Sequence, residues 1–253
     1  MFTSTDAYDR HVGRYGPALS RAHIEAAGVR PGDRVLDVGC GPGALAQALA
    51  DTVGSDRVAA VDPSPAFAEE CRLRVPGADV RIGTAEDLPD FEPAFDVVMS
   101  QLVVNFMTDA VAGVQAMRAI ARPGGLVTSC VWDYAEEMKM LPVFWDAALQ
   151  LDPDAPDEGK TMRYCSEDAL GALWEQSSLH GVETGELVVE ASYESFDDYW
   201  TPFPTGLGPS GAYCASLDPD RQEALRLECF RRLGEPSEPF TLRARAWFVR
   251  GRV

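Results

Sequence analysis

Three alternate glycines follow an apolar run near the start of the chain. Positions 35–43 read VLDVGCGPG. Glycine adopts backbone angles that are barred to other residues, and its missing side chain lets a ligand approach the main chain closely. A helix that begins after such a loop presents free N–H groups and the positive end of its dipole. The pattern therefore predicts a site for a nucleotide-like ligand at Gly39, Cys40, Gly41 and Gly43.

The same glycines also fit a dinucleotide-binding fingerprint. Positions 39–44 read GCGPGA, and Asp62 ends the next apolar run, where a ribose-binding acid belongs. A nicotinamide oxidoreductase would also need a hydride-transfer constellation, such as a Tyr-x-x-x-Lys pair. Neither Lys139 nor Lys160 has a tyrosine four residues before it. An NAD(P)-dependent oxidoreductase is therefore the weaker of the two interpretations of the loop.

Short apolar runs alternate with helix-length segments in the first half of the chain. We expect strands at 34–38, 57–61, 79–82, 95–100 and 126–132, with helices at 44–51, 65–74 and 109–121. This alternation is typical of a parallel sheet with crossover helices. In the less regular second half we expect helices at 144–150, 167–178 and 218–233, and strands at 187–191 and 241–249.

Length and loop positions predict one domain that carries insertions. A chain of 253 residues suits a single domain spanning 1–253 with a sizeable insertion. Two stretches, 133–165 and 192–217, interrupt the regular pattern after strands, where loops of an open α/β sheet overhang the ligand crevice. We expect them to form helical lids that cover the substrate.

The charge of the chain limits its partners. A formal net charge of -18 repels phosphate backbones and anionic lipids, so nucleic acids and membranes are disfavoured partners. A small acceptor, uncharged or cationic, suits such a surface better. The six cysteines are scattered without metal-ligand spacing, so no metal is expected. With neither a signal-like apolar core nor a membrane-length apolar run, we expect a cytoplasmic protein.

Four motifs together resemble one enzyme family over about residues 30–132. The spacing D-x-G-x-G-x-G at 37–43 resembles the first motif of class I S-adenosylmethionine-dependent methyltransferases, in particular those similar to ubiquinone and menaquinone biosynthesis methyltransferases. Asp62 and Pro63 match the family's ribose-binding acid and its neighbour. Positions 83–89, GTAEDLP, resemble the family loop GDAxxLP beside the adenine. Positions 95–101 and 122–125 match the fourth strand and the turn before the fifth.

The resemblance implies a fold, a cofactor and a set of residues that contact it. The fold would be a Rossmann-like, doubly wound α/β sheet, mainly parallel with one antiparallel strand, in the order 3-2-1-4-5-7-6. S-adenosylmethionine, with S-adenosylhomocysteine as product, would lie across the carboxyl ends of strands one, two and four. The implied cofactor-binding residues are Asp37, Gly39, Cys40, Gly41, Gly43, Asp62, Pro63, Thr84, Ala85, Glu86, Ser100, Gln101 and Tyr15.

Some of these residues have more specific implied roles. In the family, an acid at the position of Asp37 lies near the amino acid part of the cofactor, usually through water. Thr84 stands where the family has an acid for the adenine amino group, so Glu86 or Asp87 would have to replace that contact. Positions 8–10 and 13–15 resemble a segment that packs over the cofactor, which is why Tyr15 is included.

The predicted function is methyl transfer from S-adenosylmethionine to a small-molecule acceptor. Alignment and water exclusion supply most of what such a displacement needs, so no catalytic residue is assigned. His11 is the first candidate if a base is required. Gln101 and Asn105 follow the fourth strand and would either face the substrate or serve in capping and turns. A protein that binds the cofactor without transferring methyl is the alternative, because the class has no universal catalytic residue.

Overall fold

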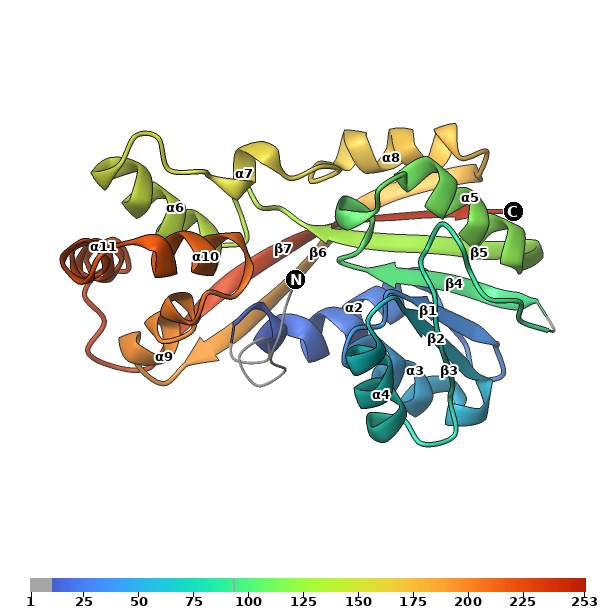
Figure 1. Ribbon diagram of the computed structural model, residues 1–253. Coiled ribbons are helices and arrows are strands. Elements are labelled where there is room, and N and C mark those ends of the chain that lie inside the picture. Colours follow the sequence, from blue (N-terminus) through green and yellow to red (C-terminus); the bar gives the residue numbers. More distant parts are fainter. Residues whose placement is uncertain (1–10, 93) are drawn as a thin grey trace. The chain divides into compact units, whose positions relative to one another are not determined.

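A mixed β-sheet organises the computed structural model, which describes residues 11–92 and 94–253 (Figure 1). Within those residues seven strands lie in the order β3-β2-β1-β4-β5-β7-β6. Their bounds are β1 Val35–Val38, β2 Val58–Asp62, β3 Asp79–Ile82, β4 Phe95–Gln101, β5 Ala121–Trp132, β6 His180–Tyr193 and β7 Phe240–Arg252. The first five pair in parallel, and β7 runs antiparallel to β5. The predicted strand order and the antiparallel strand are confirmed.

Helices cover both faces of the parallel strands. Figure 1 shows α2 (Gly16–Ala27), α3 (Ala44–Val53) and α4 (Pro65–Arg74) on one face, and α5 (Ala110–Ile120) and α8 (Glu167–Gln176) on the other. The remaining helices are α6 Met140–Leu151, α7 Glu158–Thr161, α9 Phe196–Trp200, α10 Gly208–Ser216 and α11 Pro219–Arg232, with short 3-10 turns η1 Val12–Tyr15, η2 Ser55–Arg57, η3 Val104–Phe106 and η4 Phe203–Thr205. The doubly wound arrangement that alternation predicted is therefore present.

The chain divides into two compact units. The sheet unit comprises Pro17–Trp132, Arg163–Leu187 and Ala246–Val253, and the helical unit comprises Met1–Gly16, Asp133–Met162 and Val188–Arg245. The stretch 192–217 and all but the last three residues of 133–165 belong to the helical unit. Both stretches contain helices: α6 and α7 lie in the first, and α9 and α10 in the second. Their predicted role as lids stays a prediction.

Element ends differ most from the sequence prediction at two strands, β6 and β5. The strand expected at 187–191 extends over His180–Tyr193, and its second half alternates buried and exposed residues. The strand expected to begin at residue 126 already pairs at Ala121, which lies opposite Phe95. Residues 122–125 then leave the ladder, which resumes at Leu126 opposite Val97. The RPGG turn is therefore an excursion within β5, because a proline cannot donate to the ladder.

A buried histidine links α2 to β5. The His23 side chain is fully buried, with Nε2 3.1 Å from Thr128 Oγ1 and Nδ1 3.6 Å from Cys130 Sγ. The Thr128 hydroxyl donates to Val249 O at 2.8 Å, so its oxygen is left to accept from His23 Nε2. Burial lowers the pKa of His23 to about 3, which keeps the ring neutral.

This burial predicts an acid-sensitive fold. The unfolded chain takes up a proton at His23 near the ordinary pKa of 6.5, whereas the folded chain does so only near 3. The stability that the neutral ring provides is therefore present above pH 6.5 and is lost as the pH falls. We expect this residue to lower the free energy of unfolding by about 2 kcal/mol between pH 7 and pH 5.

Urea unfolding at several pH values measures the effect. The His23→Gln variant should lose that part of the pH dependence, whatever its stability at pH 7. The matched control is His180→Gln, because His180 is exposed. Equal pH slopes for wild type and His23→Gln would contradict the assignment of a neutral buried ring.

Candidate functional site

The carboxylate of Asp62 connects the end of β2 to the glycine loop. Its Oδ2 accepts from Gly41 N at 2.8 Å, and its Oδ1 accepts from Ser64 N at 2.8 Å. Asp62 is only 6% exposed. A carboxylate offers about four acceptor positions, so each oxygen keeps the capacity for a further hydrogen bond. The group is therefore oriented by the backbone and still able to accept from two hydroxyls, as a ribose requires.

The glycine loop has the backbone shape that its composition predicts. The φ angles of Gly39, Gly41 and Gly43 are +77°, +51° and +92°. A Cβ at Gly39 would lie 2.5 Å from Val103 Cγ2, and one at Gly43 would lie 3.0 Å from Cys71 Sγ. A Cβ at Gly41 would meet no atom of the described residues within 4 Å. The loop is thus closely packed at its two ends and open at Gly41, where a ligand can approach the main chain.

Asp37 contributes a second carboxyl group to the same region. It is 1% exposed, and its Oδ2 has no hydrogen-bond partner among the described residues. Burial, and then the charge of Asp62, raises the pKa of Asp37 to about 8, against the opposing effect of the Ala46 N–H. An uncompensated buried carboxyl beside a glycine loop suits a ligand that brings a cationic or hydrogen-bond-donating group.

The loop after β3 holds three of the predicted residues. Thr84 is exposed, and its hydroxyl oxygen accepts from Asp87 N at 3.1 Å; Ala85 is buried. Glu86 Oε1 accepts from the backbone amides of Thr108 and Asp109 at 2.9 and 3.3 Å. The Glu86 carboxylate thus ties this loop to the start of α5. The sequence did not predict this anchoring role. Thr108 and Asp109 lie 22 and 23 positions after Glu86, and only the tertiary structure brings them together.

The two predicted residues at the end of β4 lie on opposite faces of the sheet. Asp37 pairs with Met99 in the ladder, and because side chains alternate, Ser100 points to the other face. Ser100 is fully buried, with its Oγ 2.9 Å from Ser129 Oγ. Gln101 shares the face of Asp37, and its Nε2 donates to Ser20 Oγ at 3.0 Å. The structure therefore brings Gln101, and not Ser100, to the face that carries Asp37.

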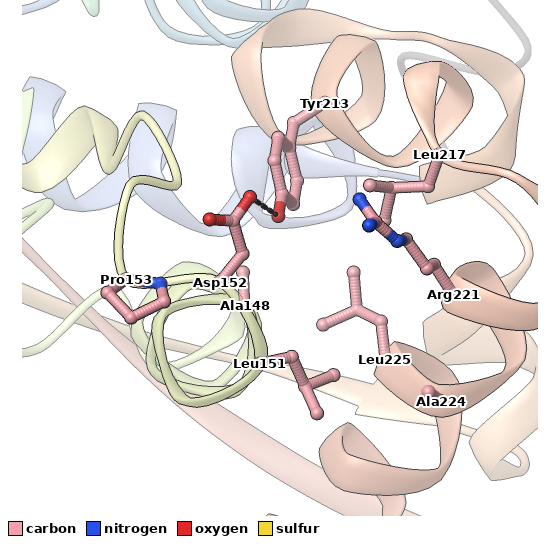
Figure 2. Close-up of a pocket in the computed structure, with 9 residues that line it drawn as sticks. All are labelled: Ala148, Leu151, Asp152, Pro153, Tyr213, Leu217, Arg221, Ala224 and Leu225. Carbon is pink, nitrogen blue, oxygen red and sulfur yellow. Dashed lines mark hydrogen bonds between the residues drawn. The ribbon is translucent and has the colours of Figure 1, made fainter.

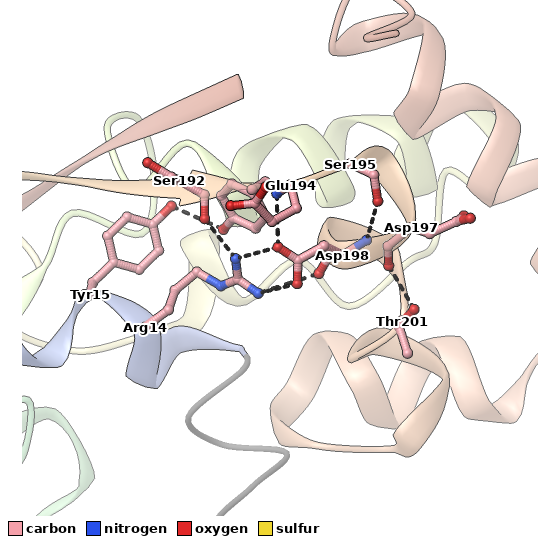
Figure 3. A network of polar contacts seen from close by, with 9 residues as sticks. Arg14, Tyr15, Ser192, Glu194, Ser195, Asp197, Asp198 and Thr201 are labelled. Atoms are coloured by element: carbon pink, nitrogen blue, oxygen red, sulfur yellow. Dashed lines mark hydrogen bonds and ion pairs between the residues drawn. The ribbon is translucent and has the colours of Figure 1, made fainter. Parts of the chain in front are cut away.

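Tyr15 belongs to the helical unit and takes part in a polar network there (Figure 3). Its hydroxyl lies 3.1 Å from the hydroxyl of Tyr193, and burial raises the pKa of Tyr15 to about 12. The adjacent Arg14 binds both carboxylate oxygens of Asp198 at 3.0 and 3.1 Å, and its guanidinium lies 4.0 Å from the centre of the Tyr193 ring. This network attaches η1 to β6 and α9. The role of Tyr15 toward the cofactor stays a prediction, and residues 8–10 lie outside the described residues.

The helical unit has a pocket of its own, with a volume of about 300 Å³ (Figure 2). Both stretches predicted as lids contribute to it, together with α11. On one side the Tyr213 hydroxyl donates to Asp152 Oδ2 at 3.1 Å, and the opposite side is apolar, with Leu151 and Leu225. The full lining is Ala148, Leu151, Asp152, Pro153, Tyr213, Leu217, Arg221, Ala224 and Leu225. The pocket can hold a small, mainly apolar group.

His11, the predicted candidate for a base, is buried in the helical unit. The edge of its ring packs against Phe203 with centroids 4.9 Å apart. Burial, and then the charge of Arg14, lowers the pKa of His11 to about 4, so the ring is neutral and a weak base. Over residues 11–92 and 94–253, no cluster of three metal-ligating side chains occurs, and no helix has the length and apolarity to cross a bilayer.

Comparisons with known proteins identify a methyltransferase domain in the chain. A family model described as a methyltransferase domain matches residues 35–125. Demethylmenaquinone methyltransferase of Beutenbergia cavernae is 38% identical over 105 residues, which are 42% of this chain and 43% of that protein. Ubiquinone biosynthesis O-methyltransferase of Azorhizobium caulinodans is 38% identical over 112 residues, 41% of this chain and 42% of that protein. The chain spans about half or less of the length of the curated relatives it matches.

Solved structures share the fold. The YcgJ protein of Bacillus subtilis has a TM-score of 0.57 at 18% identity, covering 93% of this chain and 97% of its own. A Haemonchus contortus phosphoethanolamine N-methyltransferase 2, solved with phosphomonomethylethanolamine and S-adenosylhomocysteine, has a TM-score of 0.55 at 16% identity, covering 93% of this chain and 52% of its own. With the observed strand order and glycine loop, these findings identify the fold and the motif. The chain therefore carries a methyltransferase domain at residues 35–125 and is similar to class I S-adenosylmethionine-dependent methyltransferases.

Proposed function

We propose that this protein transfers a methyl group from S-adenosylmethionine to a small-molecule acceptor. The observation that carries the proposal is the Asp62 carboxylate, which Gly41 and Ser64 orient while both of its oxygens can still accept a hydroxyl. That geometry suits the two hydroxyls of the cofactor ribose. The relatives named as quinone-pathway methyltransferases support a small-molecule acceptor.

We assign different parts of the cofactor to different residues of the sheet unit. We assign the ribose to Asp62 with Pro63 beside it, the amino acid part to Asp37, and the adenine to the loop containing Thr84, Ala85 and Glu86. The open backbone at Gly41, flanked by Gly39, Cys40 and Gly43, allows the cofactor to approach the main chain closely. Ser100, Gln101 and Tyr15 stay predicted contacts.

Methyl transfer from S-adenosylmethionine does not require a dedicated base for every acceptor. When bound, S-adenosylmethionine supplies an electrophilic methyl group on a sulfonium and leaves a neutral thioether. The protein must align the acceptor and exclude water, and it needs a base only if the acceptor has to lose a proton. His11, with its pKa of about 4, is a poor candidate for that role. We therefore assign the catalytic contribution to positioning.

Charge and cysteine chemistry support the choice of partner and compartment. The net charge of -18 favours a neutral or cationic small molecule over a nucleic acid. The six cysteines lie among the described residues as free thiols, five of them buried. Free thiols are typical of a reducing compartment, and we place the protein in the cytoplasm.

Calorimetric titration with three ligands tests the proposal. We expect micromolar binding of S-adenosylmethionine and S-adenosylhomocysteine and no binding of NADH. Binding of NADH alone would mean that the glycine loop serves a nicotinamide cofactor. Binding of both sulfur ligands without turnover in an acceptor screen that covers phenols, quinols and amines would favour the non-catalytic alternative.

Substitution of Asp62 tests the ribose assignment. In Asp62→Ala we expect affinity for S-adenosylhomocysteine to fall by about 1.5–3 kcal/mol, because the variant loses the charged acceptor for both hydroxyls. Asp62→Asn keeps one acceptor oxygen and should lose less. The control is Asp154→Asn, which changes an exposed acid of the helical unit. Wild-type affinity in a folded Asp62→Ala protein, as judged by its melting curve, would refute the assignment.

The raised pKa of Asp37 predicts that binding releases a proton. In the free protein this pKa is about 8, so the group is mostly protonated at pH 7. A cationic amino group nearby lowers the pKa and ionises the carboxyl. Affinity for S-adenosylhomocysteine should therefore rise with pH between about 6 and 8, by up to tenfold per unit.

Calorimetric titrations with S-adenosylhomocysteine at pH 7, in buffers of different ionisation enthalpy, measure how many protons are released on binding. We expect release of nearly one proton in wild type and of none in Asp37→Asn, whose amide cannot ionise. Proton release that is identical in the two proteins would exclude Asp37 as its source.

A further inference from the structure

Asn105 in η3 is a buried amide for which the described part of the chain provides no hydrogen-bond partner. Its side chain is 4% exposed, and neither Nδ2 nor Oδ1 has a hydrogen-bond partner among the described residues. A buried polar atom left without a partner destabilises the folded protein. Because most buried polar atoms in proteins are paired, an amide with both ends unpaired points to a ligand.

The chain before Asn105 is held in place. Leu102 directly follows β4 and has a φ of +62°, a backbone angle that is unfavourable for a side chain with a Cβ. Its N–H donates to Cys130 O at 2.8 Å, which fixes this turn to β5. Val103 then packs on Gly39, so closely that a Cβ there would lie 2.5 Å from Val103 Cγ2. The segment that carries Asn105 therefore adjoins the glycine loop.

The chain after Asn105 is held as well. Arg163 donates a hydrogen bond to the carbonyl of Met107. Glu86 accepts from the amides of Thr108 and Asp109, which immediately precede α5. Since both flanks are fixed, the Asn105 amide is placed by its surroundings and has little freedom to turn toward a protein partner. This is the property of a preorganised binding group.

Other unsatisfied atoms lie at the same edge of the sheet. Asp37 Oδ2 and Gln101 Oε1 are also buried without a partner in the part of the chain that the structure describes. They stand on β1 and β4, which are neighbours in the sheet. Asp37 has a proposed role toward the cofactor, and Asn105 lies four residues beyond Gln101. These three residues thus lie at or just beyond the carboxyl ends of β1 and β4, where we place the cofactor.

We propose that Asn105 determines acceptor specificity by binding a neutral group that both donates and accepts a hydrogen bond. The inference rests on the proposed function. An amide has a donor and an acceptor, so a carboxylate would leave Oδ1 unpaired and an ammonium would leave Nδ2 unpaired. A hydroxyl or a carboxamide satisfies both. The adjacent Phe106, 56% exposed, adds an apolar surface, which suits an acceptor with an aromatic or aliphatic body.

A series of ligands with one body and different polar groups tests this. Benzyl alcohol, benzamide, benzyl methyl ether, phenylacetate and benzylammonium are titrated by ligand-observed NMR into protein saturated with S-adenosylhomocysteine. The affinity of wild type for the alcohol, for the amide or for both should exceed its affinity for the ether, the carboxylate and the ammonium by at least about tenfold. A comparison of the affinities for benzyl alcohol and benzamide shows whether the site prefers a hydroxyl or a carboxamide.

Two variants connect the preference to Asn105. Asn105→Leu should lose the preference while keeping its affinity for S-adenosylhomocysteine, and its melting temperature should equal or exceed that of wild type because an unsatisfied amide is removed. Asn105→Asp has acceptors only, so its preference should move toward benzylammonium.

The two proposals fail in different ways. Absence of S-adenosylhomocysteine binding in wild type would refute the proposed function. Normal binding of that ligand together with the same ranking of the series in wild type and Asn105→Leu, or with no binding of the series at all, would refute the role of Asn105 alone.

Discussion

The hydrogen bond from Gly41 N to Asp62 is the interaction on which the site depends. It joins the loop after β1 to the end of β2, and the amides of Gly39 and Cys40 reinforce it by donating to Val61 O at 2.8 and 3.0 Å. The protein's own hydrogen bonds therefore define the shape of the loop. Because the carboxylate is aligned by backbone amides, its remaining lone pairs have a defined direction, and binding need not order the loop at an entropic cost.

The same arrangement carries a cost in stability that a bound ligand would offset. Asp37 and Asp62 are both buried, and burial raises the pKa of each. Asp62 has backbone donors that oppose this shift, whereas Asp37 has one unsatisfied oxygen among the described residues. A fold selected for stability alone would replace such a group with an apolar one. Its presence beside an open glycine loop is the physical signature of a site for a polar, partly cationic ligand.

Local sequence was sufficient for the features that depend on neighbouring residues. The glycine spacing predicted the positive φ angles, and the alternation of apolar runs predicted the parallel strands; the position of the antiparallel strand came from family resemblance. Features that depend on distant contacts were not predictable. Glu86 bonds to residues 108 and 109, and the burial of Asn105 arises only when its segment packs, because neither has a local pattern. The face of the sheet to which Ser100 points is known only from the register between β1 and β4. That register cannot be read from the sequence of either strand alone.

The family match is confined to one of the two units. The family match, residues 35–125, lies entirely within the sheet unit, which carries Asp37, Asp62 and the glycine loop. The helical unit, with the Tyr15 network and the Asp152–Tyr213 pocket, lies outside that match. A cofactor common to many enzymes constrains the residues that touch it, while different acceptors require different surfaces. Asn105 lies inside the matched region yet presents an amide suited to a particular acceptor group, so part of the acceptor selectivity is built into the sheet unit itself.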